Sequence, residues 1–278
     1  MASTQTTTTV ETKLSLAFMN ETTENAIAPE TIPKEKALHY ASEAYSWLES
    51  WGLGYQRNDP STRKQENLLF THRNGIFNRY GVAHEQFVWD LRSEESLMDK
   101  FAQIWGTDEL LVSYDGLNLS LPEAERPKTH PIFAPWSHID QSPLRSNLQC
   151  VQYIMNLLLN GPEDGGVMVL EESSKLYADV WEHFDHKKGE NGWNTWKQQF
   201  LDECALGSNR RDRTVHYGAA PSSTNDRFAA YVCYKPASMV SDEAKEVRVG
   251  AWARKDGTAH DPSVIRLTTR SPPDTHTI

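Results

Sequence analysis

Apolar side chains recur at helical spacing in two stretches near the start of the chain. In the first stretch they follow an i, i+3, i+4, i+7 pattern between Pro33 and Gly52, which predicts an amphipathic helix that ends at the glycine. In the second, Ser93 stands at the capping position of a helix whose apolar stripe ends at Gly106. Residues 177–184 favour a further helix.

Patterns typical of strands follow the second predicted helix. They predict strands at 110–121, 149–159, 167–170 and 227–234. The last of these has a period of two, so one of its faces carries Arg227, Ala229, Tyr231 and Cys233. Residues 51–80 are polar and rich in turn signals, which predicts a long surface loop. Helices that precede clustered strands favour a mainly β fold, an antiparallel sandwich or barrel with helices packed outside it.

Composition and charge describe a globular chain without a membrane span. The 278 residues include 28 basic and 38 acidic side chains, a net charge of −10 that disfavours a nucleic-acid partner. No stretch approaches the ~18 unbroken apolar residues of a membrane helix. At ~150 residues per domain the length allows one or two domains. We expect an N-terminal tail at 1–28, a single domain at 29–265 and a C-terminal tail at 266–278.

Cysteine usage and the N-terminus favour a reducing compartment. The three cysteines are Cys150, Cys204 and Cys233, and none lies in a CxxC motif. Residues 1–10 are rich in Thr and lack the charged and apolar regions of a signal peptide. We therefore expect a cytoplasmic protein with a small-molecule substrate and no membrane partner, and a homodimer stays open.

His138 and Asp140 form the first candidate for a metal site. In extended backbone, residues two apart project to the same side, so both side chains can point into one cavity. An imidazole and a carboxylate are two of the three members of the facial triad that binds non-haem Fe(II). The bare spacing also occurs in surface loops, so the hypothesis depends on later residues. These are His216, downstream, and Arg227, which opens the clearest strand.

Together with the Gly-Pro-Glu-Asp-Gly-Gly turn between the two histidines, these residues resemble the phytanoyl-CoA dioxygenase family of Fe(II)/2-oxoglutarate oxygenases over about 110–236. The resemblance implies a double-stranded β-helix core, jelly-roll or cupin-like, with flanking helices. It implies His138, Asp140 and His216 as iron ligands, and Arg227 as the partner of the far carboxylate of 2-oxoglutarate. It also implies O2-dependent oxidation of a small molecule, with release of succinate and CO2.

Four further side chains are candidates for the pocket. Gln152 is assigned to cofactor binding, and the residues assigned to substrate binding are Asn118, Trp136 and Tyr231. Core packing remains the alternative for Trp136 and Tyr231, and a strand-edge hydrogen bond for Gln152. No basic cluster suits the phosphates of coenzyme A, which favours a specialised metabolite as the substrate.

One segment departs from the family pattern and keeps a second hypothesis open. Where relatives carry an apolar strand before the distal histidine, residues 205–213 contain small residues and three arginines. The chain could therefore be a weakened or inactive homologue that acts as a binding or partner subunit. His183 and His186 have a spacing that zinc ligands use, but a solvated helix face explains them more simply.

Overall fold

The computed structural model describes residues 31–69, 71, 75–122, 138–140, 148–170, 173, 215–219 and 221–266. In chain order, with 3-10 helices written η, the elements are α1 (Lys34–Ser50), η2 (Pro60–Thr62), η3 (Gln65–Asn67), β1 (Ile76–Phe77), η4 (Val82–His84), α2 (Gln86–Arg92), α3 (Glu95–Trp105), β2 (Leu110–Val112), β3 (Leu117–Ser120), β4 (Val151–Asn156), β5 (Gly166–Val169), β6 (His216–Ala219), β7 (Arg227–Pro236), η8 (Ala237–Met239), α6 (Asp242–Arg254), β8 (Gly257–Thr258) and β9 (Ile265–Arg266). Within this part of the chain, none of the helices combines the length and apolar character needed to cross a membrane.

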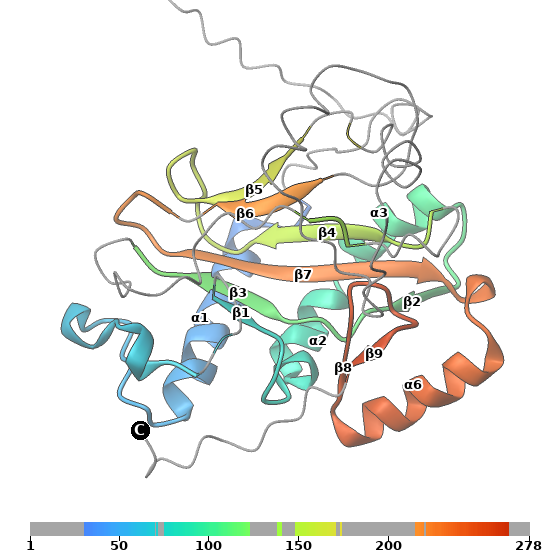
Figure 1. The fold of residues 1–278 in the computed structure, drawn as a ribbon, viewed down its shortest axis with the longest axis horizontal. Helices are drawn as coiled ribbons and strands as arrows, with labels where there is room; N and C mark the ends of the chain where they lie inside the picture. Colours follow the sequence, from blue (N-terminus) through green and yellow to red (C-terminus); the bar gives the residue numbers. More distant parts are fainter. Residues whose placement is uncertain are drawn as a thin grey trace, which may run out of the picture.

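Strand β7 is the centre of a five-stranded antiparallel sheet (Figure 1). Strand β4 pairs with one edge of β7, while β3 and β2 pair one after the other with its opposite edge. Strand β1 lies outside β3, and β5 and β6 form a separate antiparallel pair above β4 in the view of Figure 1. The fold therefore combines antiparallel sheets with helices, and the double-stranded β-helix stays a prediction.

The alternation of β7 separates the hydrophobic core from the candidate site. Its even-numbered side chains from Phe228 to Tyr234 belong to the main core together with residues of α1, α3 and β3. The rings of Phe101 on α3 and Tyr234 lie 4.9 Å apart. Burying each such side chain contributes about 1.5–3 kcal/mol. The odd-numbered residues, with Arg227 and Cys233 among them, point to the other side, as the period of two predicts.

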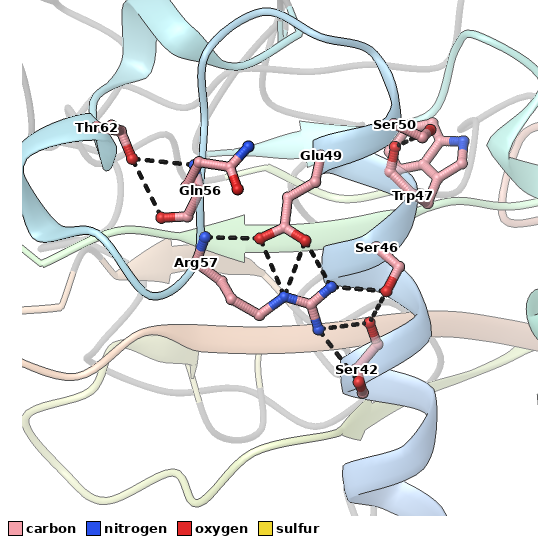
Figure 2. A network of polar contacts seen from close by, with 8 residues as sticks. All are labelled: Ser42, Ser46, Trp47, Glu49, Ser50, Gln56, Arg57 and Thr62. Carbon is pink, nitrogen blue, oxygen red and sulfur yellow. Dashed lines mark hydrogen bonds and ion pairs between the residues drawn. The ribbon is translucent and has the colours of Figure 1, made fainter.

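The predicted first helix is confirmed as α1, and an arginine ties its end to the chain that follows. Figure 2 shows Arg57 hydrogen-bonded to Glu49 near the C-terminus of α1. Its Nη2 atom donates to Oε2 of Glu49 at 2.7 Å, and its backbone N–H donates to Oε1 at 2.7 Å. The same guanidinium donates to the Ser46 hydroxyl and to the Ser42 carbonyl, which lie about one and two turns before Glu49 on the helix. The hydrogen bonds from Arg57 lower the pKa of the Glu49 carboxyl group. Together with the serine contacts, they hold the segment after α1 against the helix.

Three sequence predictions need correction. Residues 51–80 are not wholly a surface loop, because Tyr55 and Phe77 are almost fully buried and β1 lies within the range. Ser93 does not cap α3: it ends α2, and Glu94 precedes α3. The strand predicted at 110–121 is two strands, β2 and β3, which pair with different ends of β7. Gly106 ends α3, as predicted, and it does so in the left-handed conformation. The helix predicted at 177–184 lies outside the described residues.

Two glycines allow β1 to lie against β3. A Cβ atom on Gly75 would stand 1.8 Å from the carbonyl oxygen of Leu119, and one on Gly116 would stand 1.9 Å from that of Phe77. Gly75 also has a φ of +72°, which side chains rarely adopt. No other residue fits either position without moving the backbone, so these glycines set the spacing of the strands behind the site.

Candidate metal centre

Two histidines from distant parts of the chain are direct cross-strand partners. The His138 N–H donates to the His216 carbonyl at 2.9 Å, and the His216 N–H donates to the His138 carbonyl at 3.0 Å. Residues paired in this way project their side chains to the same face of a sheet. The two imidazole rings accordingly lie 4.4 Å apart between centroids. The structure therefore brings the downstream histidine next to the early His-x-Asp motif.

The carboxylate of Asp140 faces the Nε2 atoms of both rings. Its Oδ1 atom is 3.4 Å from Nε2 of His138, and its Oδ2 atom is 3.3 Å from Nε2 of His216. One ligand atom from each of the three residues lies within 4.8 Å of the other two. Two imidazoles and one carboxylate are the donor set of the facial triad, which leaves further positions on the metal open.

The two oxygens of Asp140 have different surroundings. Oδ2 accepts a hydrogen bond from Nε2 of Gln152 at 2.9 Å. Oδ1 is buried, and no described residue donates a hydrogen bond to it. A buried carboxylate oxygen that accepts no hydrogen bond is costly, and a divalent cation held by the two imidazoles would satisfy it. This donor set fits a bound Fe(II).

The charges around Asp140 keep it in the form that a metal needs. Burial alone would raise the pKa of its carboxyl group, but the positive charges of His260 and His216 hold that pKa well below the usual range. Metals bind carboxylates and not carboxylic acids. Asp140 is therefore ready to act as a ligand without first losing a proton.

Arg227 offers a buried positive charge at the start of β7. Its Nη1 atom donates to Oδ1 of Asn118 at 2.8 Å, and its Nε atom has no hydrogen-bond partner among the described residues. Burial lowers its pKa, while the neighbouring Tyr231 opposes that effect. No carboxylate in the described ranges forms an ion pair with this guanidinium. A buried guanidinium of this kind fits the carboxylate of a ligand.

The turn before β5 brings the β5–β6 pair close to Arg227. Asp164 accepts hydrogen bonds from the Gly161 N–H at 2.6 Å and from Nδ2 of Asn225 at 3.1 Å, which ties the turn to the segment before β7. Gly166, the first residue of β5, has a φ of +144°, and a Cβ there would lie 3.9 Å from Nε of Arg227. Strand β6, which begins at His216 and pairs with β5, therefore belongs to a strand pair that lies close to Arg227.

The other candidates from the sequence differ in where the structure places them. Gln152 contacts the carboxylate of Asp140, and Asn118 contacts the guanidinium of Arg227. Tyr231 lies on the same face of β7, where burial raises its pKa to about 12. The candidates that lie outside the described residues are Trp136, His183, His186 and the divergent segment 205–213.

Sequence reasoning missed two residues of this site, His260 and Asp115. Nδ1 of His260 lies 2.5 Å from Oδ2 of Asp115, and its Nε2 lies 3.8 Å from Oδ2 of Asp140. Burial opposes the charged form of His260, but the two carboxylates raise its pKa to about 9. Neither residue belongs to a motif with regular spacing, since packing alone brings them together.

Comparison with known proteins finds a relative at the level of sequence. The chain is 33% identical over 245 residues to a protein of Aspergillus versicolor described as Ava biosynthesis cluster protein O, covering 81% of this chain and 76% of that protein. No family model matches the chain. Two structures of the non-heme monooxygenase ThoJ, the apo form and the nickel complex, align over 74% of this chain and 71% and 70% of theirs, at 12% identity. Their TM-scores of 0.38 and 0.37 do not establish a shared fold.

Proposed function

The chain belongs to the family of Ava biosynthesis cluster protein O, and we propose that it is an Fe(II)- and 2-oxoglutarate-dependent oxygenase with a double-stranded β-helix core. One observation carries this proposal: His138, Asp140 and His216 converge although the chain between them is long. The backbone bridge between the two histidines makes that convergence part of the fold. The donor set is the one that non-haem iron oxygenases use.

The roles of the residues follow from their surroundings. His138, Asp140 and His216 would hold the iron, with Oδ1 of Asp140 as the carboxylate ligand. Arg227 would pair with the far carboxylate of 2-oxoglutarate, at the end of β7 nearest the β5–β6 pair. With these groups bound, the centre supplies oxidation of a substrate by O2, coupled to conversion of 2-oxoglutarate into succinate and CO2. The protein orients the reactants and excludes water from them.

The substrate class comes from the relative and from the charge of the chain. The relative is described as a biosynthesis cluster protein, which supports a small molecule of specialised metabolism as the substrate. The net charge of −10 makes a nucleic-acid substrate unfavourable. Asn118 and Tyr231 share the site face with Arg227 and are the described residues we propose for substrate contact, with Trp136 as a further candidate.

Succinate formation tests this function. The purified chain is supplied with Fe(II), 2-oxoglutarate and O2, and succinate and bound iron are measured together. We expect wild type to retain iron and form succinate, whereas His216→Ala and Asp140→Ala lose both, since each removes one of three ligands. The control is His84→Ala, because Nε2 of His84 contacts the carbonyl of Asp256 and no triad residue.

The contrary result is equally clear. If well-folded wild type neither retains iron nor forms succinate, the oxygenase proposal is wrong. The hypothesis of a non-catalytic binding or partner subunit would then be favoured.

A further inference from the structure

An imidazole that the triad does not use lies between two carboxylates. Nδ1 of His260 faces Oδ2 of Asp115 at 2.5 Å, and Nε2 faces Oδ2 of Asp140 at 3.8 Å. The ring also packs at a steep angle against the ring of Tyr231, with a centroid distance of 5.7 Å. Each of its nitrogens therefore faces a different carboxylate, and one of those carboxylates belongs to the candidate metal site.

We propose that His260, oriented by Asp115, is a positioning residue for Asp140, an inference that rests on the proposed function. Gln152 donates a hydrogen bond to Oδ2 of Asp140, and Nε2 of His260 lies 3.8 Å from the same oxygen, within ion-pair but not hydrogen-bond distance. The triad imidazoles flank the carboxylate, with Nε2 of His216 at 3.3 Å from Oδ2 and Nε2 of His138 at 3.4 Å from Oδ1, and no described residue donates a hydrogen bond to Oδ1. The hydrogen bond from Gln152 and the nearby imidazole of His260 both favour one rotation of the carboxylate, which leaves Oδ1 for the metal. Outer groups that hold a ligand in this way strengthen metal binding.

The β8–β9 hairpin holds His260 in place. The Thr258 N–H donates to the Tyr114 carbonyl at 3.0 Å, and the Tyr114 N–H donates to Oγ1 of Thr258 at 2.9 Å. Beyond His260, both carboxylate oxygens of Asp261 lie 3.1 Å from Nζ of the buried Lys235 on β7. The imidazole is thus anchored on both sides along the chain, to the segment before β3 and to β7.

Asp115 is held in turn by the packed interior. Its Oδ1 atom accepts the N–H of Gly116 at 2.8 Å, and its carbonyl accepts a hydrogen bond from the fully buried guanidinium of Arg92. The backbone of Gly116 lies against the Phe77 carbonyl so closely that a side chain is excluded. The residue that orients His260 is therefore fixed from both the helical side, by α2, and the strand side, by β1.

The same neighbourhood contains a second group of metal-ligating side chains, Asp115, Cys233 and His260, whose ligand atoms lie within 4.8 Å of one another. Burial raises the pKa of the Cys233 thiol well above its usual range, whereas metals bind the thiolate. The Nδ1 atom of His260 is already engaged by Asp115. These contacts favour a positioning role over a second metal ion, and metal counting separates the two.

Two substitutions of His260 separate the roles of its nitrogens. The side-chain amide of Asn occupies the place of Nδ1 and that of Gln the place of Nε2, so His260→Gln alone keeps a polar group toward Asp140. The full-length chain is titrated with Co(II), followed by visible absorption, chelator competition and metal counting. We expect His260→Asn to weaken Co(II) binding about 10–100-fold and to change the absorption spectrum. His260→Gln should recover most of the affinity.

The matched control is His84→Asn. Nε2 of His84 contacts the carbonyl of Asp256, just before β8, at 2.8 Å, so this variant loosens the base of the hairpin without removing a group near Asp140. It should bind Co(II) as wild type does. Wild-type affinity in His260→Asn, or equal losses in His260→Asn and His84→Asn, would overturn the positioning role. So would two Co(II) ions in wild type with one lost in His260→Asn.

The triad variants keep this inference distinct from the proposed function. If His216→Ala loses Co(II) but His260→Asn does not, the positioning role alone is wrong. If wild type binds no Co(II), or if His216→Ala binds it unchanged, the metal site itself is wrong.

Discussion

At the scale of residues, two buried atoms indicate what the candidate site can bind. Oδ1 of Asp140 and Nε of Arg227 are both buried, and neither has a hydrogen-bond partner among the described residues. One is an acceptor suited to a cation, and the other is a donor suited to an anion. A bound metal and an acidic cosubstrate would satisfy both atoms at once, and this pairing supports the proposal that the site binds iron and 2-oxoglutarate together.

Removing the guanidinium should separate cosubstrate binding from metal binding. We expect Arg227→Ala to raise the 2-oxoglutarate requirement at least tenfold, because a buried charged hydrogen bond contributes about 1.5–3 kcal/mol. Iron binding should stay nearly intact, because Arg227 contacts Asn118 and Tyr231 and no triad residue. The KM for 2-oxoglutarate and the iron content are the measurements. An unchanged KM would remove the role assigned to Arg227.

The resemblance to a family motif singled out the three triad candidates and Arg227 in the sequence, whereas no motif contained His260 or Asp115. His138 and Asp140 are two residues apart, and Arg227 opens a strand with clear alternation. His260 lies in the turn of a hairpin, and Asp115 lies in the break between β2 and β3. Their proximity depends on backbone contacts between Thr258 and Tyr114, which leave no periodic signal in the sequence.

At the scale of elements, the sequence predicts those helices and strands whose apolar residues recur with a regular period. Helices α1 and α3 bury one face each and were predicted, as was β7. Helix α6 was missed because its apolar residues do not share a buried face: Val249 and Trp252 are exposed, whereas Arg248 is buried. The guanidinium of Arg248 donates to the Val112 carbonyl, so a charged residue attaches this helix to the sheet.

The contact between β1 and β3 makes a sharp prediction about stability. Gly75→Ala should lower the free energy of unfolding by more than about 2 kcal/mol, because the new Cβ meets the Leu119 carbonyl in a strained backbone conformation. Gly52→Ala is the control: its φ is +67°, but nothing lies within 4 Å of its Cβ position. It should cost about 1 kcal/mol, from the backbone alone. Equal losses in urea denaturation would contradict the close approach of β1 and β3.

At the scale of the whole molecule, buried carboxylates join parts that are distant in sequence. Glu94, before α3, accepts hydrogen bonds from Lys36 at 2.6 Å and Tyr40 at 2.5 Å, both on α1. Asp261, in the β8–β9 hairpin, contacts Lys235 on β7. Burial by itself would raise the pKa of each carboxyl group. The hydrogen bonds and charges of these partners, with Ser263 beside Asp261, lower both pKa values instead.

The lowered pKa values of Glu94 and Asp261 lead us to expect that acid destabilises the fold. Their folded-state pKa values lie below the unfolded values of about 4, so the unfolded chain binds more protons as the pH falls. Their contribution is present above the unfolded pKa and is lost as the pH drops through the folded one. Glu94→Gln should flatten this decline in urea denaturation between about pH 6 and pH 3. An identical pH profile in wild type and Glu94→Gln would refute the contribution of Glu94.

The alternation of side chains along β7 ties the register of this strand to both the core and the candidate site. Phe228 faces the core and Arg227 faces the site, and this alternation continues along the strand. A slip of one residue against β3 and β4 would turn the guanidinium into the aromatic interior and the phenyl ring toward the proposed metal ligands. A misaligned strand would therefore lose its packing at the same moment as its chemistry, so a chain that has folded stably has also assembled the reactive side of this strand correctly.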